Sequence, residues 1–189
     1  MCWKYLLYFK HLFLTFELDP RLGGKNKISD PTTKEFSFLS KAKIRPTPKT
    51  YWYDPSIGTY LLGIISKAQL MQDFHTLGIY FENQVIKDLM VYTHAIDAQF
   101  YFYRDENGLE IDAIMELSDD SWEAIEIKLG SDEAIIQTTK NLLRFSQYIQ
   151  KRTAKKSPAF LLIITAAHLE QAYQQDNGVY VIPHPCLTY

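Results

Sequence analysis

The chain has 189 residues, 47% of them hydrophobic and 22% charged, and this composition excludes an intrinsically disordered protein. Its two cysteines, Cys2 and Cys186, lie at opposite ends, which excludes a disulfide-rich scaffold and predicts a cytoplasmic protein with reduced thiols. The formal net charge is −2, and no apolar run is long enough to cross a bilayer, so no membrane partner is expected.

The charge is distributed unevenly along the chain. Residues 1–70 carry 11 Lys and Arg against 5 Asp and Glu, residues 71–140 carry 4 against 15, and residues 141–189 carry 5 against 2. An acidic centre flanked by basic segments suits a metal site beside a polyanion, although linear charge blocks need not form surface patches.

Residues 1–55 are predicted to form a small N-terminal α+β extension, for which a winged-helix-like remnant is one interpretation. A helix is expected first, followed by strands at residues 11–19 and 35–45 with a polar connection between them. Prolines at positions 46 and 48 end the second strand. The extension has too few apolar positions for a core of its own, and its abrupt start indicates that a preceding segment has been lost.

Helical and strand patterns alternate from residue 55 onward. Asp54 and Pro55 form a capping signal for a short helix, and apolar residues at helical spacing predict a longer helix after it. A continuous apolar run near the C-terminus is typical of a strand buried on both faces. The main predicted elements are a helix at 76–93, strands at 98–105, 109–117 and 122–129, a helix at 131–150, and strands at 159–169 and 178–183.

The order of these elements predicts the fold class. Turn residues at 106–108 and 118–121 join three strands into consecutive hairpins. A helix then crosses over to the fully apolar strand. We therefore expect residues 56–189 to form one α/β domain with a central mixed sheet flanked by helices.

Charged and apolar residues mix on two neighbouring strands of this sheet. Because side chains alternate along a strand, Glu126 and Lys128 share one face and lie about 6–7 Å apart. By the same rule, Glu110 and Asp112 are expected to share a face with Ile114. Such a mixture suits a sheet face that is covered by the core at one end and opens into a functional site at the other.

Two interpretations of these residues stay open. Alternating charged and apolar residues are common on half-exposed strands, so an ordinary surface is the simpler interpretation. If the strand is central, however, its charges are partly buried, and burial is costly unless the charges pair or bind a metal. Asp112, Glu126 and the Ile127 carbonyl would be sufficient protein ligands for Mg²⁺. Lys128 would then orient or deprotonate the water that attacks a phosphodiester, or stabilise negative charge.

The series Glu82, Asp112 and Glu126-Ile127-Lys128 resembles the PD-(D/E)XK motif, and the predicted elements match the αβββαβ core of the restriction-endonuclease-like superfamily. More narrowly, the chain resembles an uncharacterised domain found C-terminal to a P-loop ATPase module in bacterial and archaeal AAA-type proteins. The segments that carry this resemblance are PKTYWYDPSIGTYLLGI, GIYFENQVIKDLM, FYFYRDENGLEIDAIME, AIEIKLG and GVYVIP. No G-x-x-x-x-G-K-S/T motif occurs here, so the chain is expected to be a truncated product or a fragment without ATPase activity.

The resemblance implies a metal-dependent nuclease that acts on DNA. Asp112 and Glu126 would bind Mg²⁺ or Mn²⁺, and Lys128 would be the catalytic lysine. Glu82 would be a further catalytic acid that reaches the metal directly or through water. Gln137 would occupy an auxiliary position in the following helix, and an ATPase is the protein partner that the resemblance suggests.

The alternative is a catalytically inactive nuclease-fold module that binds nucleic acid or a protein partner. A basic cluster near the end of the second long helix would follow a nucleic-acid backbone, although basic loops are more often simply solvated. Arg104 would either touch a phosphate or pair with Glu110. The five histidines show no paired ligand spacing, so a zinc site is not expected. The basic cluster consists of Lys151, Arg152, Lys155 and Lys156.

Overall fold

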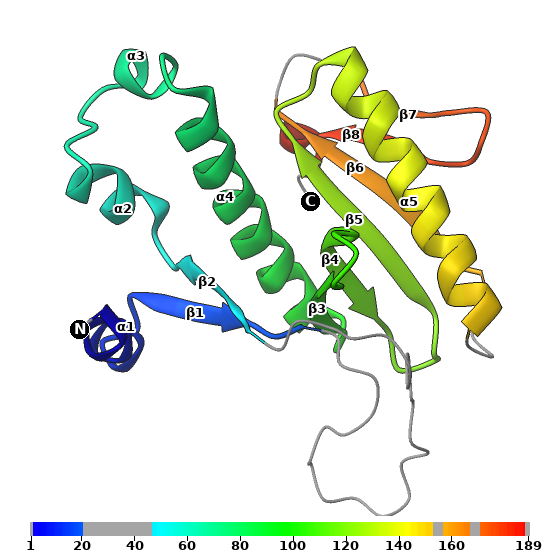
Figure 1. The fold of residues 1–189 in the computed structure, drawn as a ribbon, viewed down its shortest axis with the longest axis horizontal. Helices are drawn as coiled ribbons and strands as arrows, with labels where there is room; N and C mark the ends of the chain where they lie inside the picture. Colours follow the sequence, from blue (N-terminus) through cyan, green and yellow to red (C-terminus); the bar gives the residue numbers. More distant parts are fainter. Residues whose placement is uncertain (1, 21–46, 153–156, 167–170, 188–189) are drawn as a thin grey trace, which may run out of the picture.

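The computed structural model describes residues 2–20, 47–152, 157–166 and 171–187 (Figure 1). None of the helices within these ranges is both long and apolar enough to cross a membrane. The helices are α1 Cys2–His11, α2 Pro55–Leu61, α3 Lys67–Leu70, α4 Phe74–Ala95, α5 Asp132–Arg152 and the short 3₁₀ helix η1 His184–Leu187. The strands are β1 Thr15–Leu18, β2 Lys49–Trp52, β3 Gln99–Arg104, β4 Glu110–Glu116, β5 Trp122–Lys128, β6 Phe160–Thr165, β7 Tyr173–Gln174 and β8 Tyr180–Pro183.

The main sheet is mixed and has six strands in the order β3-β4-β5-β6-β8-β7. Strands β3, β4 and β5 form an antiparallel meander, whereas β5, β6 and β8 run parallel to one another. Parallel neighbours need a crossover connection, and α5 makes the one between β5 and β6. The expected α/β fold with a mixed sheet flanked by helices is therefore confirmed.

The two faces of β5 carry different cores. Trp122 and Ala124 lie in the cluster beneath α5, whereas Ile125 and Ile127 lie in the cluster beneath α4. This is the alternation that a period of two predicts, and Figure 1 shows the two helices on opposite sides of the sheet. The helix residues in the two clusters include Leu142, Phe145 and Ile149 of α5 and Val85, Ile86 and Leu89 of α4.

Side-chain caps set the starts of two helices. The Asp54 side chain accepts a hydrogen bond from the Ser56 N–H, and Pro55 is the first residue of α2, as the sequence predicts. Helix α4 begins at Phe74, two residues before its predicted start, because Asp73 rather than a later residue caps it through the Thr76 N–H. The cap therefore fixes where the helix that carries Glu82 begins.

The N-terminal strands form a separate two-stranded antiparallel sheet, in which Thr15 of β1 lies opposite Trp52 of β2. The strand expected at 11–19 is present at Thr15–Leu18, whereas the one expected at 35–45 lies outside the described residues. Strand β2 follows the two prolines and was not predicted. The Phe102 N–H donates to the Asp19 carbonyl across 3.1 Å, which attaches the end of β1 to β3 of the main sheet.

Core packing also joins the two sheets. Phe16 and Leu18 of β1 and Tyr51 of β2 belong to the same buried cluster as Val85 of α4. The division of the chain at residue 55 stays a prediction, but the core beneath α4 contains side chains from both sides of it. This packing places β2 beside α4, where the candidate site lies.

Strand β4 contains a bulge. Tyr101 of β3 pairs with Ile114, while Tyr103 pairs with Ile111, so three steps along β4 match two steps along β3. As a result, Ile111 and Ile114 lie in the same core cluster beneath α5. The expectation that Asp112 shares a face with Ile114 is therefore wrong, because the bulge interrupts the alternation immediately after Asp112.

Candidate functional site

Four acidic side chains and two lysines meet near one end of β4 and β5. They come from strand β2, helix α4 and the two central strands, which are brought together by the packing of β2 on α4 and of α4 on the sheet. We call this set the acid–lysine cluster. It consists of Lys49, Glu82, Glu110, Asp112, Glu126 and Lys128.

Asp112 is anchored between β4 and β5 where the two strands part. Regular pairing of these strands extends to Ala113 opposite Ile125 and stops there. Beyond that point, Oδ2 of Asp112 accepts the Ile127 N–H across 3.0 Å, so a carboxylate takes the place of a backbone acceptor. Asp112 as a whole residue is only 5% exposed. The bulge thus turns Asp112 into the gap between the strands.

Lys128 links the two carboxyl groups that the sequence analysis singled out. Its Nζ lies 2.7 Å from Oε2 of Glu126 and 3.1 Å from Oδ2 of Asp112. Burial on its own would lower the pKa of Lys128, but the flanking carboxyl groups outweigh it and raise the pKa above its ordinary value. Lys128 is therefore an ammonium group at neutral pH.

The two carboxyl groups themselves differ in charge. Burial, reinforced by neighbouring Asp112, raises the pKa of Glu126 to about 8 despite Lys128. Burial would also raise the pKa of Asp112, but Lys128, Lys49 and hydrogen bonds from Glu126 and the Ile127 N–H hold it below its usual range. The two directions favour negative charge on Asp112 and a proton on Glu126, and a side-chain hydrogen bond joins the two groups.

Lys49 lies among Asp112 and two further carboxylates. Its Nζ is 3.0 Å from Glu82 Oε1, 2.8 Å from Glu110 Oε1 and 3.4 Å from Asp112 Oδ1. Burial lowers the pKa of Lys49, but Asp112, Glu82 and Glu110 together raise it. The ammonium group also lies 5.5 Å from the centre of the Phe102 ring, within the range of a cation–π contact. Lys49 therefore neutralises the side of the cluster that Lys128 does not reach.

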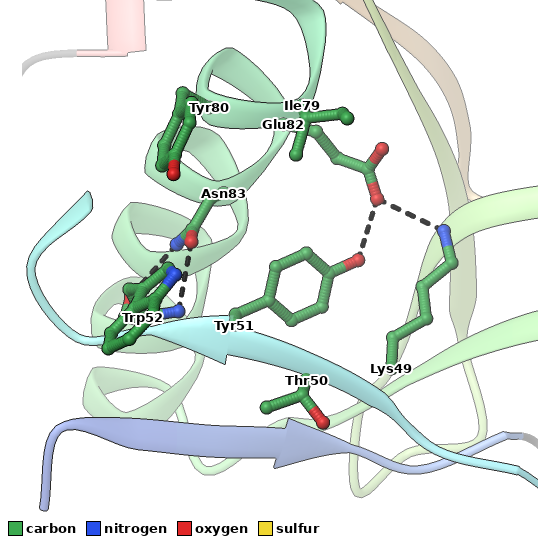
Figure 2. A pocket seen from close by; sticks show the side chains of 8 residues that line it. All are labelled: Lys49, Thr50, Tyr51, Trp52, Ile79, Tyr80, Glu82 and Asn83. Carbon is green, nitrogen blue, oxygen red and sulfur yellow. Dashed lines mark hydrogen bonds and ion pairs between the residues drawn. The ribbon is translucent and has the colours of Figure 1, made fainter. Parts of the chain in front are cut away.

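Glu82 faces the cluster but is held from two sides. Its Oε1 accepts hydrogen bonds from Lys49 Nζ and, across 2.7 Å, from the Tyr51 hydroxyl. Figure 2 shows both donors converging on this carboxylate. Burial and the nearby Glu82 raise the pKa of Tyr51, so its hydroxyl stays a donor. Lys49 thus bridges Glu82, the acid predicted on the helix, and Asp112.

Arg104 and Glu110 form a two-pronged ion pair at the edge of the cluster. Nε of Arg104 lies 2.9 Å from Oε2 of Glu110, and its second guanidinium nitrogen lies 2.6 Å from Oε1. Of the two roles expected for Arg104, the structure shows the pairing with Glu110. Burial would raise the pKa of Glu110, but Arg104 and Lys49 lower it, so Glu110 is charged.

The cluster mixes possible metal ligands with lysine side chains. Within the described ranges, no group of three or more Asp, Glu, His or Cys side chains is arranged to hold a metal. Lysine ammonium groups lie between the carboxylates instead. Asp112 and Glu126 are nevertheless adjacent buried carboxyl groups that share a proton, and oxygen donors of this kind suit Mg²⁺ or Mn²⁺. A divalent cation at these two residues stays a hypothesis, in which the cation would take the place of the proton between them.

Two of the remaining predicted residues, Gln137 and Lys151, are exposed on α5 and do not join the cluster. Gln137 is exposed on α5, and its amide donates to Asn141 across 3.3 Å. Lys151 is exposed near the end of the same helix. The side chain of Arg152 and residues Lys155 and Lys156 lie outside the described part of the chain.

Sequence reasoning missed three residues at or beside the site. Lys49 and Tyr51 lie on the unpredicted strand β2, and the only local signal for it is the short Lys-Thr-Tyr-Trp alternation after Pro48. Thr165 of β6 lies opposite Lys128 in the parallel register, and its buried hydroxyl has no hydrogen-bond partner among the described residues. The apolar pattern of β6 gives no sign of this polar end.

A pocket of about 270 Å³ lies beside the cluster, between β2 and α4 (Figure 2). The Asn83 side chain fixes one wall, because it accepts the Trp52 N–H across 2.9 Å and donates to the Trp52 carbonyl across 2.8 Å. The pocket is lined by Lys49, Thr50, Tyr51, Trp52, Ile79, Tyr80, Glu82 and Asn83.

The fold and the site define an α/β protein with a mixed six-stranded sheet. The sheet carries two buried carboxyl groups, Asp112 and Glu126, and lysines contact them. Residues 77–187 match the family described as a domain of unknown function, DUF4143. The match covers more than half of the chain, so the protein belongs to this family. Neither the curated proteins nor the solved structures contain a match.

Proposed function

We propose that this protein is a divalent-metal-dependent nuclease of the PD-(D/E)XK type that hydrolyses DNA phosphodiesters. The observation that carries the proposal is the contact of Lys128 Nζ with both Asp112 and Glu126, two buried carboxyl groups from neighbouring strands. An acid on β4 followed by an acid and a lysine two residues apart on β5 is the motif that the sequence resembles. The order α4, β3, β4, β5, α5, β6 is consistent with the αβββαβ core.

Hydrolysis requires a water oxygen to bond to phosphorus while the bond from phosphorus to the leaving sugar oxygen breaks. The water loses a proton, and the leaving oxygen gains one. A divalent cation supplies Lewis acidity to such a reaction. Asp112 and Glu126 would hold that cation through their carboxyl oxygens, and Glu126 would lose its proton in doing so.

Without a metal, Asp112 and Glu126 raise the pKa of Lys128, so it is a donor and a positive charge. A cation held by the same two residues would compete with Lys128 for their charge, and Lys128 could then also deprotonate the attacking water. It would hold the attacking water or a phosphate oxygen and stabilise negative charge on it. Glu82 would contribute by positioning Lys49, which it contacts directly.

The test is cleavage of plasmid and single-stranded DNA with Mg²⁺ or Mn²⁺. We expect cleavage by the wild type, none in EDTA, and a loss of about 100-fold or more in Lys128→Ala, as when one charge-stabilising donor is removed. Lys140→Ala is the matched control, because Lys140 is exposed on α5. Equal rates for the wild type and Lys128→Ala would overturn the assignment, as would cleavage that persists in EDTA.

One observation favours a second candidate, a non-catalytic module that binds nucleic acid or a protein partner such as an ATPase. Lys49 and Lys128 already neutralise the buried carboxylates without a metal. This candidate predicts no Mg²⁺ or Mn²⁺ binding by calorimetry, and DNA binding that survives Asp112→Asn. The nuclease proposal predicts metal binding that Asp112→Asn abolishes.

A further inference from the structure

The pocket between β2 and α4 is continuous with the acid–lysine cluster. Lys49 and Glu82 line the pocket and also belong to the cluster, and Glu82 lies one helical turn from Ile79 on α4. A strand whose phosphate reached Asp112 would therefore carry a neighbouring nucleotide past the pocket. Its volume of about 270 Å³ is small for a ligand site, which suits one ring system rather than a larger ligand.

Aromatic side chains provide the walls of this pocket. Trp52 and Tyr51 come from β2, and Tyr80 comes from α4 with the exposed Ile79 beside it (Figure 2). The Trp52 and Tyr80 side chains are only partly buried, so their rings are accessible from the pocket. Bases stack on such rings in proteins that bind single strands, whatever the base.

Two polar atoms of the walls lack partners. The Tyr80 hydroxyl and Nε1 of Trp52 make no hydrogen bond within the described part of the chain. They converge on Gly58 of α2, where an added Cβ would lie 2.5 Å from the hydroxyl and 2.7 Å from Nε1. Both atoms lie against α2, whose Gly58 does not line the pocket, so the proposal depends on the aromatic rings and not on these two groups.

The pocket is built on fixed backbone. Asn83 holds Trp52 through two hydrogen bonds, and Tyr51 is buried with its hydroxyl on Glu82. A site whose walls are already ordered loses little entropy on binding.

We propose that this pocket holds one unpaired nucleobase of the substrate, so that the chain acts on single-stranded polynucleotides. The proposal rests on the proposed nuclease function and specifies its substrate class. A base inside a duplex is stacked and paired, and it must leave the helix before a pocket of this kind can enclose it. In a single strand the base is not paired, so less free energy is needed to move it into the pocket.

The experiment measures binding to the wild-type protein in EDTA, at one fixed salt concentration, by fluorescence anisotropy. The probes are a short oligothymidylate, an abasic sugar-phosphate oligomer of the same length and a blunt duplex, with oligouridylate to compare RNA with DNA. We expect the oligothymidylate to bind about tenfold more tightly than the abasic oligomer or the duplex, as stacking of one base gives. Equal affinities would overturn the proposal.

A variant locates the effect. Tyr80→Ala should weaken oligothymidylate binding about tenfold and leave binding of the abasic oligomer unchanged. Tyr60→Ala is the matched control, because Tyr60 is 73% exposed on α2 and does not line the pocket. Loss of affinity for both oligomers in folded Tyr80→Ala would overturn the assignment to a base. If Tyr80→Ala fails to fold, the affinities of the wild type for the two oligomers still show whether binding depends on the base.

The result is separable from the test of catalysis. If the protein cleaves DNA but binds both oligomers equally, the assignment of the pocket to a base is wrong, whereas the proposed nuclease function stands. Base-dependent binding without cleavage would support the pocket and remove the catalytic role.

Discussion

The amide of Asn83 pairs with the backbone of Trp52 as a neighbouring strand would. Its nitrogen donates to the Trp52 carbonyl across 2.8 Å, and its oxygen accepts the Trp52 N–H across 2.9 Å. Asn83 is only 4% exposed, so water does not compete for these bonds. One side chain of α4 thereby fixes the strand that carries Lys49 and Tyr51.

Replacing Asn83 with alanine should therefore destabilise the protein by about 2–4 kcal/mol, because two backbone groups lose their buried partners. Asn141→Ala is the control. Among the described residues its side chain is hydrogen-bonded to the exposed Gln137, and we expect a change below about 0.5 kcal/mol. Urea unfolding of both variants measures the difference. Equal stabilities would show that another contact holds β2 on α4.

Two helical glycines should respond in opposite directions to alanine. An added Cβ at Gly58 of α2 would lie 2.5 Å from the Tyr80 hydroxyl, whereas at Gly78 of α4 the nearest atom is 3.9 Å away, on Leu129. Gly58→Ala should cost about 1–3 kcal/mol through overpacking. Gly78→Ala should stabilise by up to about 1 kcal/mol through helix propensity. Thermal unfolding checks both signs, and an increase in Tm for Gly58→Ala would contradict the packing of α2 on Tyr80.

Lys49 should contribute more to stability than an exposed lysine. Lys49→Met leaves the carboxylates of Glu82, Glu110 and Asp112 without their shared cation, which should cost about 3 kcal/mol at neutral pH. Lys10→Met removes the exposed pair with Glu17 and should cost less than about 1 kcal/mol. Chemical denaturation in EDTA compares the two variants. A Lys49 effect no larger than that of Lys10 would mean that the cluster is solvated.

The shared proton of Glu126 should make stability depend on pH. Folded Glu126 keeps its proton up to about pH 8, whereas the unfolded chain releases it near about pH 4. The unfolded state therefore binds fewer protons between these values, and stability falls as pH rises, by at most about 1.4 kcal/mol per pH unit. Glu126→Gln removes this titration while its amide can still donate to Asp112. The free energy of unfolding, measured by chemical denaturation in EDTA, should change less between pH 5 and pH 8 in the variant than in the wild type. The same pH dependence in both proteins would refute the shared proton.

Local patterns in the sequence predict much of the fold. The helix cap at Asp54, the hairpin turn after Asp105 and the acidic first turn of α5 each appear where the chemistry of those residues places them. The proximity of Glu126 and Lys128 follows from strand alternation, because both are on one straight strand whose neighbours are apolar.

The rest of the site depends on contacts that no local pattern contains. Lys49 reaches Asp112 from 63 positions away, and its strand has only four residues after a proline-rich break. The bulge in β4 is equally hidden, since Ile111 and Ile114 are both apolar and period two assigns them to opposite faces. The orientation of Asp112 therefore had to come from the structure.

The cluster also has a consequence for how the chain acquires its native state. Lys49 contacts Glu82 across 33 positions of sequence and Asp112 across 63. Closing loops of this length costs more conformational entropy than forming local contacts does. Helix α4 and the β3-β4-β5 meander are local and can form without β2. Lys128 is already present on β5, so the docking of β2 adds the second lysine and gives Glu82, Glu110 and Asp112 a shared cation. One short strand thus links the packing of the N-terminal segment to the charge balance of the site.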